Sequence, residues 1–371
     1  MIKSSRGCCG TEELAEVKEA FEYGYFGLAY KTNEFEQEIG KYLNTDRFVI
    51  AASTGTNALH LALDTIGIGK GDEVIMPSFT FVATAQAVAM CGAKPVFCEV
   101  DPVTFLIDVE DVKKKITDKT KAIIPVHYAG RPCDMDALMK IKEDTGIRIV
   151  EDAAHAFGSW YKGKKIGSFG DITCFSFDSI KVMTCGEGGA IVTDDPAFDD
   201  LSRKKRLLGI DRKTMHVKDW KKRSWVYDVP TLGYRYHMSN INAAIGLAQI
   251  KKVDKFIERR RELCHLYDKE LKDVSGVEIM PDEYDTITPF MYVIRVKDGK
   301  RNALKDYLME HDIESGISYI PCHHFSLFKG NEELPVTDHI YEEILCVPMH
   351  YELSDDDVRE VCNRIKEFLA Q

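Results

Sequence analysis

Short apolar runs that alternate with helical stretches constrain the fold of this chain most strongly. We predict strands at 47–52, 73–76, 94–99, 122–126, 147–151, 172–177 and 190–193. Most of these runs lack a clean apolar–polar alternation, which is typical of strands that are covered on both faces. Helical patterns are found at 11–25, 32–43, 83–91 and 135–143. The order of the elements predicts an α/β fold built on one central sheet.

The character of the sequence changes after about residue 200. The basic clusters Arg203–Arg206 and Lys221–Arg223 flank a region that we expect to be a polar loop. Residues 242–271 then predict one long helix or a bent pair. A strand-like run at 288–296 and helical patterns at 302–311 and 355–369 predict a compact α+β unit. We therefore expect a large domain over 1–250 and a smaller C-terminal domain over 251–371.

Composition narrows the class of protein. The chain has 371 residues and a formal net charge of −11, which argues against a protein that coats nucleic acid. Its 11 cysteines are scattered and form no Cys-x-x-Cys pair, so we expect reduced thiols and no metal site. No segment reaches the ~18 apolar residues that span a bilayer. A soluble, cytoplasmic protein without a membrane partner is expected.

One lysine and one aspartate suggest a cofactor. Lys181 lies in a loop between a predicted strand and a Gly-rich turn, and Asp152 ends the preceding predicted strand. This arrangement fits pyridoxal 5'-phosphate (PLP), whose aldehyde reacts with a lysine and whose ring nitrogen pairs with an acid. Taken alone, Asp152 would sooner be read as a helix cap, and Lys181 as an ordinary solvated lysine.

Further polar residues could complete such a site. The segment 53–58 leads from a strand into a helix, where free N–H groups and hydroxyls can bind a phosphate. It could also be an ordinary helix cap. His155 could bond the oxygen of the cofactor ring, and Ser176 could reach the phosphate. Neither residue would indicate a site by itself, so the prediction depends on their occurring together and in this order.

Seven strings of the sequence resemble the DegT-type sugar aminotransferases, which are PLP enzymes of the aspartate-aminotransferase fold, fold type I. The resemblance covers nearly the whole chain, and it is carried by residues 53–59, 71–84, 125–130, 150–158, 170–177, 181 with 186–193, and 242–249. It implies a large domain with a mostly parallel sheet flanked by helices, and a smaller α+β domain.

The resemblance also implies roles for individual residues. Lys181 matches the lysine that carries the cofactor covalently, and Asp152 matches the acid at the ring nitrogen. Phe81 matches the aromatic residue that stacks on the ring, although a phenylalanine can simply belong to a core. Three residues match contacts to the cofactor phosphate, namely Thr56, Asn57 and Ser176. His323 lies near a substrate-side histidine of the family, with His324 as a rival.

The chain departs from the family pattern at three positions. His155 stands where glutamine is usual, although histidine also occurs there. Arg235 replaces an asparagine that reaches the cofactor phosphate of the neighbouring subunit, and it could bind that phosphate, bind the substrate or be exposed. Arg131 stands where glutamine is common, and this difference could alter the part of the site that binds the substrate.

The activity implied is transfer of an amino group from glutamate to a nucleotide-linked keto-sugar, at C3 or C4, within a homodimer whose sites lie at the interface. Arg235, Arg212 and Lys213 are candidates for contacting the substrate's diphosphate. Two alternatives remain open: a dehydratase of the same fold, and a regulatory protein that binds a ligand without turnover. In that dehydratase branch histidine replaces the lysine, so Lys181 argues against it. The sugar, the nucleotide and the pathway, whether polysaccharide, glycoconjugate or secondary metabolite, stay open.

Overall fold

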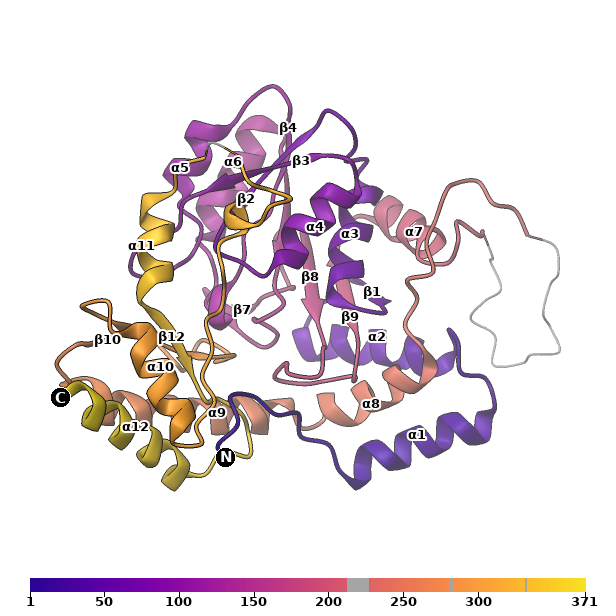
Figure 1. The fold of residues 1–371 in the computed structure, drawn as a ribbon. Coiled ribbons are helices and arrows are strands. Elements are labelled where there is room, and N and C mark those ends of the chain that lie inside the picture. The colour runs from indigo at the N-terminus through magenta and orange to yellow at the C-terminus, as the bar shows by residue number, and fades with distance from the viewer. Residues whose placement is uncertain (212–226, 281–282, 331) are drawn as a thin grey trace.

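A seven-stranded sheet forms the centre of the protein (Figure 1). The computed structural model describes residues 1–211, 227–280, 283–330 and 332–371. The strand order is β1-β9-β8-β5-β4-β2-β3, and β9 alone runs antiparallel to its neighbours. The strands are β1 (Phe48–Ala52), β2 (Glu73–Pro77), β3 (Lys94–Cys98), β4 (Thr120–Ile123), β5 (Arg148–Asp152), β8 (Ile172–Ser176) and β9 (Gly189–Thr193). The predicted α/β fold with a mostly parallel sheet is confirmed.

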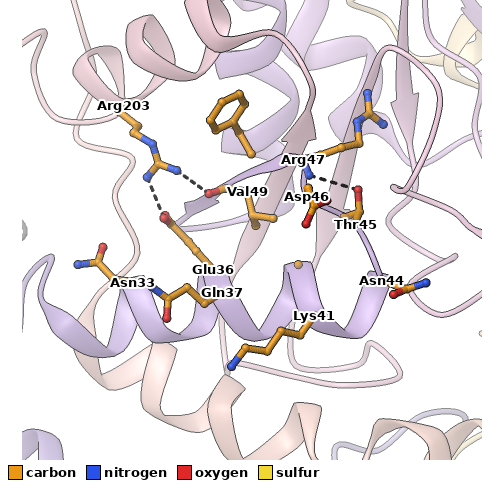
Figure 2. A pocket seen from close by; sticks show the side chains of 12 residues that line it. Asn33, Glu36, Gln37, Lys41, Asn44, Thr45, Asp46, Arg47, Val49 and Arg203 are labelled. Atoms are coloured by element: carbon orange, nitrogen blue, oxygen red, sulfur yellow. Dashed lines mark hydrogen bonds and ion pairs between the residues drawn. The ribbon is translucent and has the colours of Figure 1, made fainter.

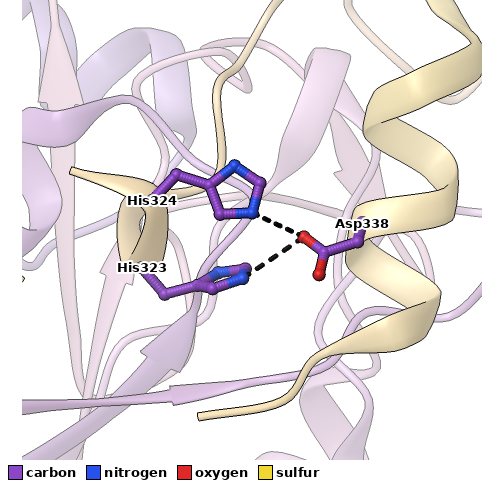
Figure 3. A group of neighbouring side chains, drawn as sticks. All are labelled: His323, His324 and Asp338. Carbon is purple, nitrogen blue, oxygen red and sulfur yellow. Dashed lines mark ion pairs between the residues drawn. The ribbon is translucent and has the colours of Figure 1, made fainter. Parts of the chain in front are cut away.

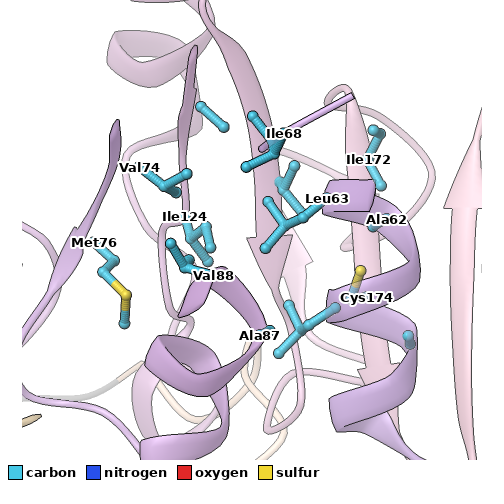
Figure 4. Packing of buried hydrophobic residues seen from close by; sticks show 14 of the residues in the cluster. Ala62, Leu63, Ile68, Val74, Met76, Ala87, Val88, Ile124, Ile172 and Cys174 are labelled. Carbon is cyan, nitrogen blue, oxygen red and sulfur yellow. The ribbon is translucent and has the colours of Figure 1, made fainter. Parts of the chain in front are cut away.

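Helices cover both faces of this sheet. One face packs against α3 (Gly55–Thr65), α4 (Val82–Met90) and α7 (Pro196–Lys205), and Figure 4 shows part of this core. The other face packs against α2 (Tyr30–Leu43), α5 (Val109–Lys115), α6 (Met135–Thr145) and α8 (Asn240–Ile250). Neighbouring residues of β8 illustrate the arrangement, since Cys174 belongs to the first core and Phe175 to the second. Both faces are apolar, which explains why the strands show no alternation.

The C-terminal part forms a second, smaller unit with a sheet of its own. Its antiparallel sheet has the order β10-β11-β12, with β10 (Val277–Ile279), β11 (Tyr292–Val296) and β12 (Ile344–Val347). Around it lie α9 (Val253–Leu271), α10 (Arg301–Glu310), α11 (Pro335–Glu343) and α12 (Asp355–Leu369). The start of the chain joins this unit, because Ile2 bridges to Ile313 and packs on the same core. The boundary predicted near residue 250 falls between α8 and α9 and stays a prediction.

Several elements differ from the sequence expectation. Residues 242–271 form two helices, α8 and α9. Of the two predicted alternatives, one long helix or a bent pair, the bent pair is confirmed. A small hairpin of β6 (Trp160–Tyr161) and β7 (Lys164–Lys165) was not predicted. The helix predicted at 11–25 is α1 (Thr11–Tyr23), which packs on α8. None of the helices in the described ranges is long and apolar enough to cross a membrane.

Arg203–Arg206 lies at the end of a helix, and most of the polar loop predicted after this cluster lies outside the described residues, so that part stays a prediction. Arg203 lies in the last turn of α7, and Arg206 follows directly. Residues three apart share one side of a helix, so both guanidinium groups reach Glu36 on α2. The Arg203 Nη1–Glu36 Oε2 distance is 2.8 Å, and Figure 2 shows this pair beside Val49 in a surface pocket. The second cluster, Lys221–Arg223, lies outside the described residues.

Candidate active site

A cavity of about 360 Å³ lies where the parallel strands β5 and β8 end. Ligands of open α/β sheets bind at this edge because strand ends and helix starts meet there. The cavity is lined by six of the residues predicted from the sequence, namely Thr56, Phe81, Asp152, His155, Ser176 and Lys181. Residues that are far apart along the chain are therefore brought together in one cavity.

The start of α3 forms one end of the cavity. Thr54 caps this helix by accepting a hydrogen bond from the Asn57 N–H, at 3.0 Å. The N–H groups of Gly55 and Thr56 lie in the first turn of α3, where they have no partner within the helix and can bind an anion, which the positive helix end also favours. A Cβ on Gly55 would lie 2.7 Å from the Ser176 Cβ, so only glycine lets the two meet. Together these groups form a cradle suited to a phosphate.

Asp152 is held at the end of β5. Its Oδ2 accepts a hydrogen bond from the Thr84 hydroxyl at 2.7 Å, and its Oδ1 accepts one from the Ala154 N–H at 3.1 Å. Burial raises the pKa of the Asp152 carboxyl above its ordinary value, while these hydrogen bonds and the Lys181 charge act in the opposite direction. A buried carboxylate fixed in this way is ready to pair with a cationic ligand atom.

Lys181 is the cationic side chain of the same cavity. Burial lowers the pKa of the Lys181 amine from 10.5 to about 8, although the charges of Asp152 and Asp178 partly oppose the shift. The Nζ lies 4.3 Å from the centroid of the Phe290 ring. Near neutral pH roughly a tenth of the amine is then neutral, far more than for an ordinary lysine, and the neutral form is the one that a nucleophile or a proton carrier needs.

His155 forms part of the wall, between two aromatic rings. Its ring stacks on Phe290 at a centroid distance of 4.1 Å, and its Nε2 lies 3.1 Å from the Tyr319 hydroxyl. The Nδ1 accepts a hydrogen bond from the Ala129 N–H at 3.3 Å. Burial, with the Lys181 charge, holds the pKa of His155 well below its ordinary value, so the ring is neutral. Since both nitrogens have partners here, the contact of His155 with the cofactor ring stays a prediction.

Phe81 stands at the mouth of the cavity. Its side chain, on the residue just before helix α4, is 54% exposed, so it does not belong to a core. Its ring lies 5.6 Å from the ring of Tyr319, measured between centroids. An exposed aromatic face over a cavity is suited to stacking on a planar ligand.

The remaining predicted residues lie elsewhere. The Asn57 amide binds the Ser53 hydroxyl at 2.8 Å behind the cradle. Arg235 is exposed on a segment that bridges to Leu207, and Arg131 is buried away from the cavity. His323 and His324 line a neighbouring cavity instead. Arg212 and Lys213 lie outside the described residues.

Three side chains that shape the site were not predicted from the sequence, namely Thr84, Phe290 and Tyr319. Thr84 belongs to the string 71–84, three residues after Phe81, and Tyr319 lies four residues before His323, so both are close in sequence to predicted site residues. Phe290 comes from the C-terminal part, and no local pattern distinguishes it from a core phenylalanine.

Comparison with known proteins identifies the family. The model of the DegT/DnrJ/EryC1/StrS aminotransferase family matches residues 8–366. This chain belongs to that family. The dTDP-4-dehydro-2,3,6-trideoxy-D-glucose 4-aminotransferase of Saccharopolyspora spinosa is 33% identical over 99% of this chain and 96% of its own length.

Solved structures agree. The aminotransferase TlmJ of Streptoalloteichus hindustanus matches with a TM-score of 0.92 and 33% identity, covering 100% of this chain and 99% of its own. The putative sugar aminotransferase Spr1654 of Streptococcus pneumoniae, in its PMP form, matches with a TM-score of 0.92 and 29% identity over 100% and 99% of the two chains. The protein is therefore a PLP-dependent sugar aminotransferase of fold type I.

The residues of this cavity fit PLP. Gly55 and Thr56 with Ser176 offer N–H and hydroxyl groups for a phosphate, Asp152 offers a carboxylate for a ring nitrogen, and Lys181 offers a partly neutral amine. The donor set matches the three polar parts of the cofactor, and Phe81 adds a flat apolar wall.

Proposed function

We propose that this enzyme transfers an amino group from glutamate to C3 or C4 of a nucleotide-linked keto-sugar. The observation that carries the proposal is the buried Lys181 amine, with its pKa near 8, in one cavity with the fixed carboxylate of Asp152. The printed name of the Saccharopolyspora spinosa relative, a 4-aminotransferase for a dTDP-linked sugar, supports this substrate class.

Each residue has a distinct task in this reaction. PLP, when bound, supplies an electron sink for negative charge that develops on the carbon bearing the nitrogen. Asp152 keeps the ring nitrogen protonated by pairing with it. Lys181 removes the proton from that carbon of the donor and returns a proton later, which its lowered pKa permits. The start of α3 anchors the phosphate, and Tyr319 and His155 close the wall and exclude water.

The decisive assay is glutamate-dependent conversion of a panel of nucleotide-linked keto-sugars by the purified holoenzyme. We expect one amino sugar and one 2-oxoglutarate per turnover, and NMR of the product locates the new amine. Loss of a hydroxyl without transfer of nitrogen would instead identify a dehydratase. A cofactor-loaded enzyme whose visible absorbance does not respond to glutamate would contradict the proposed donor.

The lowered pKa of Lys181 predicts how the apoprotein captures its cofactor. Only the neutral amine attacks the aldehyde, so the rate of covalent capture should rise with pH and level off above about 8. The absorbance of the bound cofactor, followed by stopped flow over a pH series, measures this. In Asp178→Asn the midpoint should move to lower pH, because the Asp178 charge raises the pKa of Lys181. A wild-type midpoint above about 10, the ordinary lysine value, would contradict the burial effect.

Arg235 tests the proposed homodimer. The side chain is exposed and does not line the cavity of its own chain, so we propose that it reaches the phosphate or the substrate of the partner's site. Arg235→Ala should weaken binding of PLP or of the sugar nucleotide about tenfold or more, since a charge-assisted contact is lost. Titration of both ligands measures the effect, and Arg259→Ala, at an arginine of α9, serves as the control. Unchanged affinities for both ligands would make Arg235 an ordinary surface residue.

A further inference from the structure

Three potential metal ligands converge outside the cofactor cavity. His323 and His324 lie in the short helix η3 (Cys322–His324), and Asp338 lies on α11. The Nε2 atoms of the two imidazoles lie 3.2 and 2.8 Å from the same oxygen, Oδ1 of Asp338 (Figure 3). Ligand atoms of all three residues lie within 4.8 Å of one another. Separations of this size are common around one small metal ion.

Hydrogen bonding does not account for this arrangement. The Asp338 Oδ1 is buried, yet no N–H in the described part of the chain is aligned with it as a hydrogen-bond donor. A buried carboxylate oxygen without a donor is costly. An ion between the two imidazoles and the carboxylate would use the lone pairs of all three groups at once.

Ser78 fixes one of the rings from behind. Its Oγ lies 2.7 Å from the Nδ1 of His323 and accepts a hydrogen bond from the backbone N–H of the same residue at 3.1 Å. Ser78 is fully buried at the end of β2, so it cannot move away. Histidines that bind metals are commonly held at the second ring nitrogen in this way, which directs the first nitrogen toward the ion.

The group borders a cavity of about 490 Å³ that is separate from the cofactor cavity. Glu332 also lines it, and the Oε2 of Glu332 is buried without a hydrogen-bond partner among the described residues. The cavity therefore offers room for a water molecule as a further ligand.

We propose that His323, His324 and Asp338 bind one divalent transition-metal ion, Zn²⁺ by preference, with water in the fourth position. Two imidazoles and a carboxylate are a donor set that zinc uses in tetrahedral sites with an open position. The ion would join η3 to α11 and so hold in place the segment that carries Tyr319. The scattered cysteines predicted no metal site, whereas these ligands are two adjacent histidines and an aspartate 14 residues after the second, which come together only in the fold.

Zinc binding to the holoenzyme tests this proposal. Protein stripped with a chelator and dialysed against Zn²⁺ should hold one zinc per chain by mass spectrometry. His324→Ala should weaken that binding at least tenfold. With Co²⁺ in place of zinc, the wild type should show the visible absorption of a tetrahedral site, and His324→Ala should lose it. His324 is partly exposed, so the variant should fold, which its circular dichroism checks.

Two controls separate this site from other zinc ligands. His339→Ala removes an exposed histidine of α11, the helix that carries Asp338. This variant should bind zinc as the wild type does. The measurement is repeated in a Cys8→Ser/Cys9→Ser background, because Cys9 is exposed and Cys8 partly so. The proposal is overturned if the wild type binds no zinc, if His324→Ala binds it equally well, or if the cysteine background abolishes binding. None of these outcomes depends on the sugar or donor, so the proposed function is tested separately.

Discussion

Lys181→Ala should abolish amino transfer, with a loss of at least about 10³-fold in kcat, because the variant lacks both the covalent partner of the cofactor and the proton carrier. No other lysine lines the cavity in the described part of the chain, so no neighbouring amine can replace it. The fold should persist, since removing a buried amine with a lowered pKa also removes a desolvation cost.

Covalent trapping locates the lysine directly. Borohydride reduction of the holoenzyme should fix the cofactor to the peptide that contains Lys181, and the alanine variant should give no labelled peptide. Lys181→Arg should be as inactive as the alanine variant, because a guanidinium cannot lose its proton in this way. Lys113→Ala, at an exposed lysine of α5, should behave as the wild type. A label on another lysine, or turnover above about one percent in Lys181→Ala, would refute the assignment.

The part of the site that belongs to the large sheet could be predicted from the sequence. Asp152 and Ser176 end parallel strands, and Gly55 begins the helix after another strand, so the fold class alone places them along one edge. Local spacing then identifies the loop that carries Lys181. The alternation of strands and helices in the sequence predicts the order and direction of the strands. That topology places these residues at one edge of the sheet, so they meet in one cavity.

The C-terminal contribution could not be predicted in this way. Tyr319 reaches the cavity, and Phe290 reaches the side chains of Lys181 and His155, only because the smaller unit packs against the large sheet. No local pattern encodes that packing. His323 illustrates the same limit: its match to a substrate-side histidine stays a prediction, and only the fold brings it together with His324 and Asp338 at a neighbouring cavity. Arg206 is a third example, because a run of basic residues does not reveal that one of them is buried against Glu36.

Asp152→Asn should separate activity from stability. An amide keeps the shape of the carboxylate and can still accept the Ala154 N–H, but it cannot form an ion pair with a protonated ring nitrogen. The cofactor then becomes a poorer electron sink, and we expect kcat to fall by about 10²- to 10³-fold. Steady-state kinetics at saturating glutamate and sugar nucleotide, with the cofactor content verified by absorbance, measure this loss.

The stability of the same variant should move in the opposite direction. Burial raises the pKa of Asp152 in the folded protein. At a pH above the ordinary carboxyl pKa, the ionised carboxylate therefore destabilises the folded state, and replacing it with a neutral amide removes this destabilisation. The apoprotein of Asp152→Asn should therefore melt at the same or a higher temperature than the wild type at pH 7. Asp178→Asn, which removes a charge from the same cavity, should reduce kcat by less than about tenfold, because it alters only the field at Lys181. A nearly normal rate in Asp152→Asn would leave Asp152 with no role beyond binding the Ala154 N–H in the turn that follows β5.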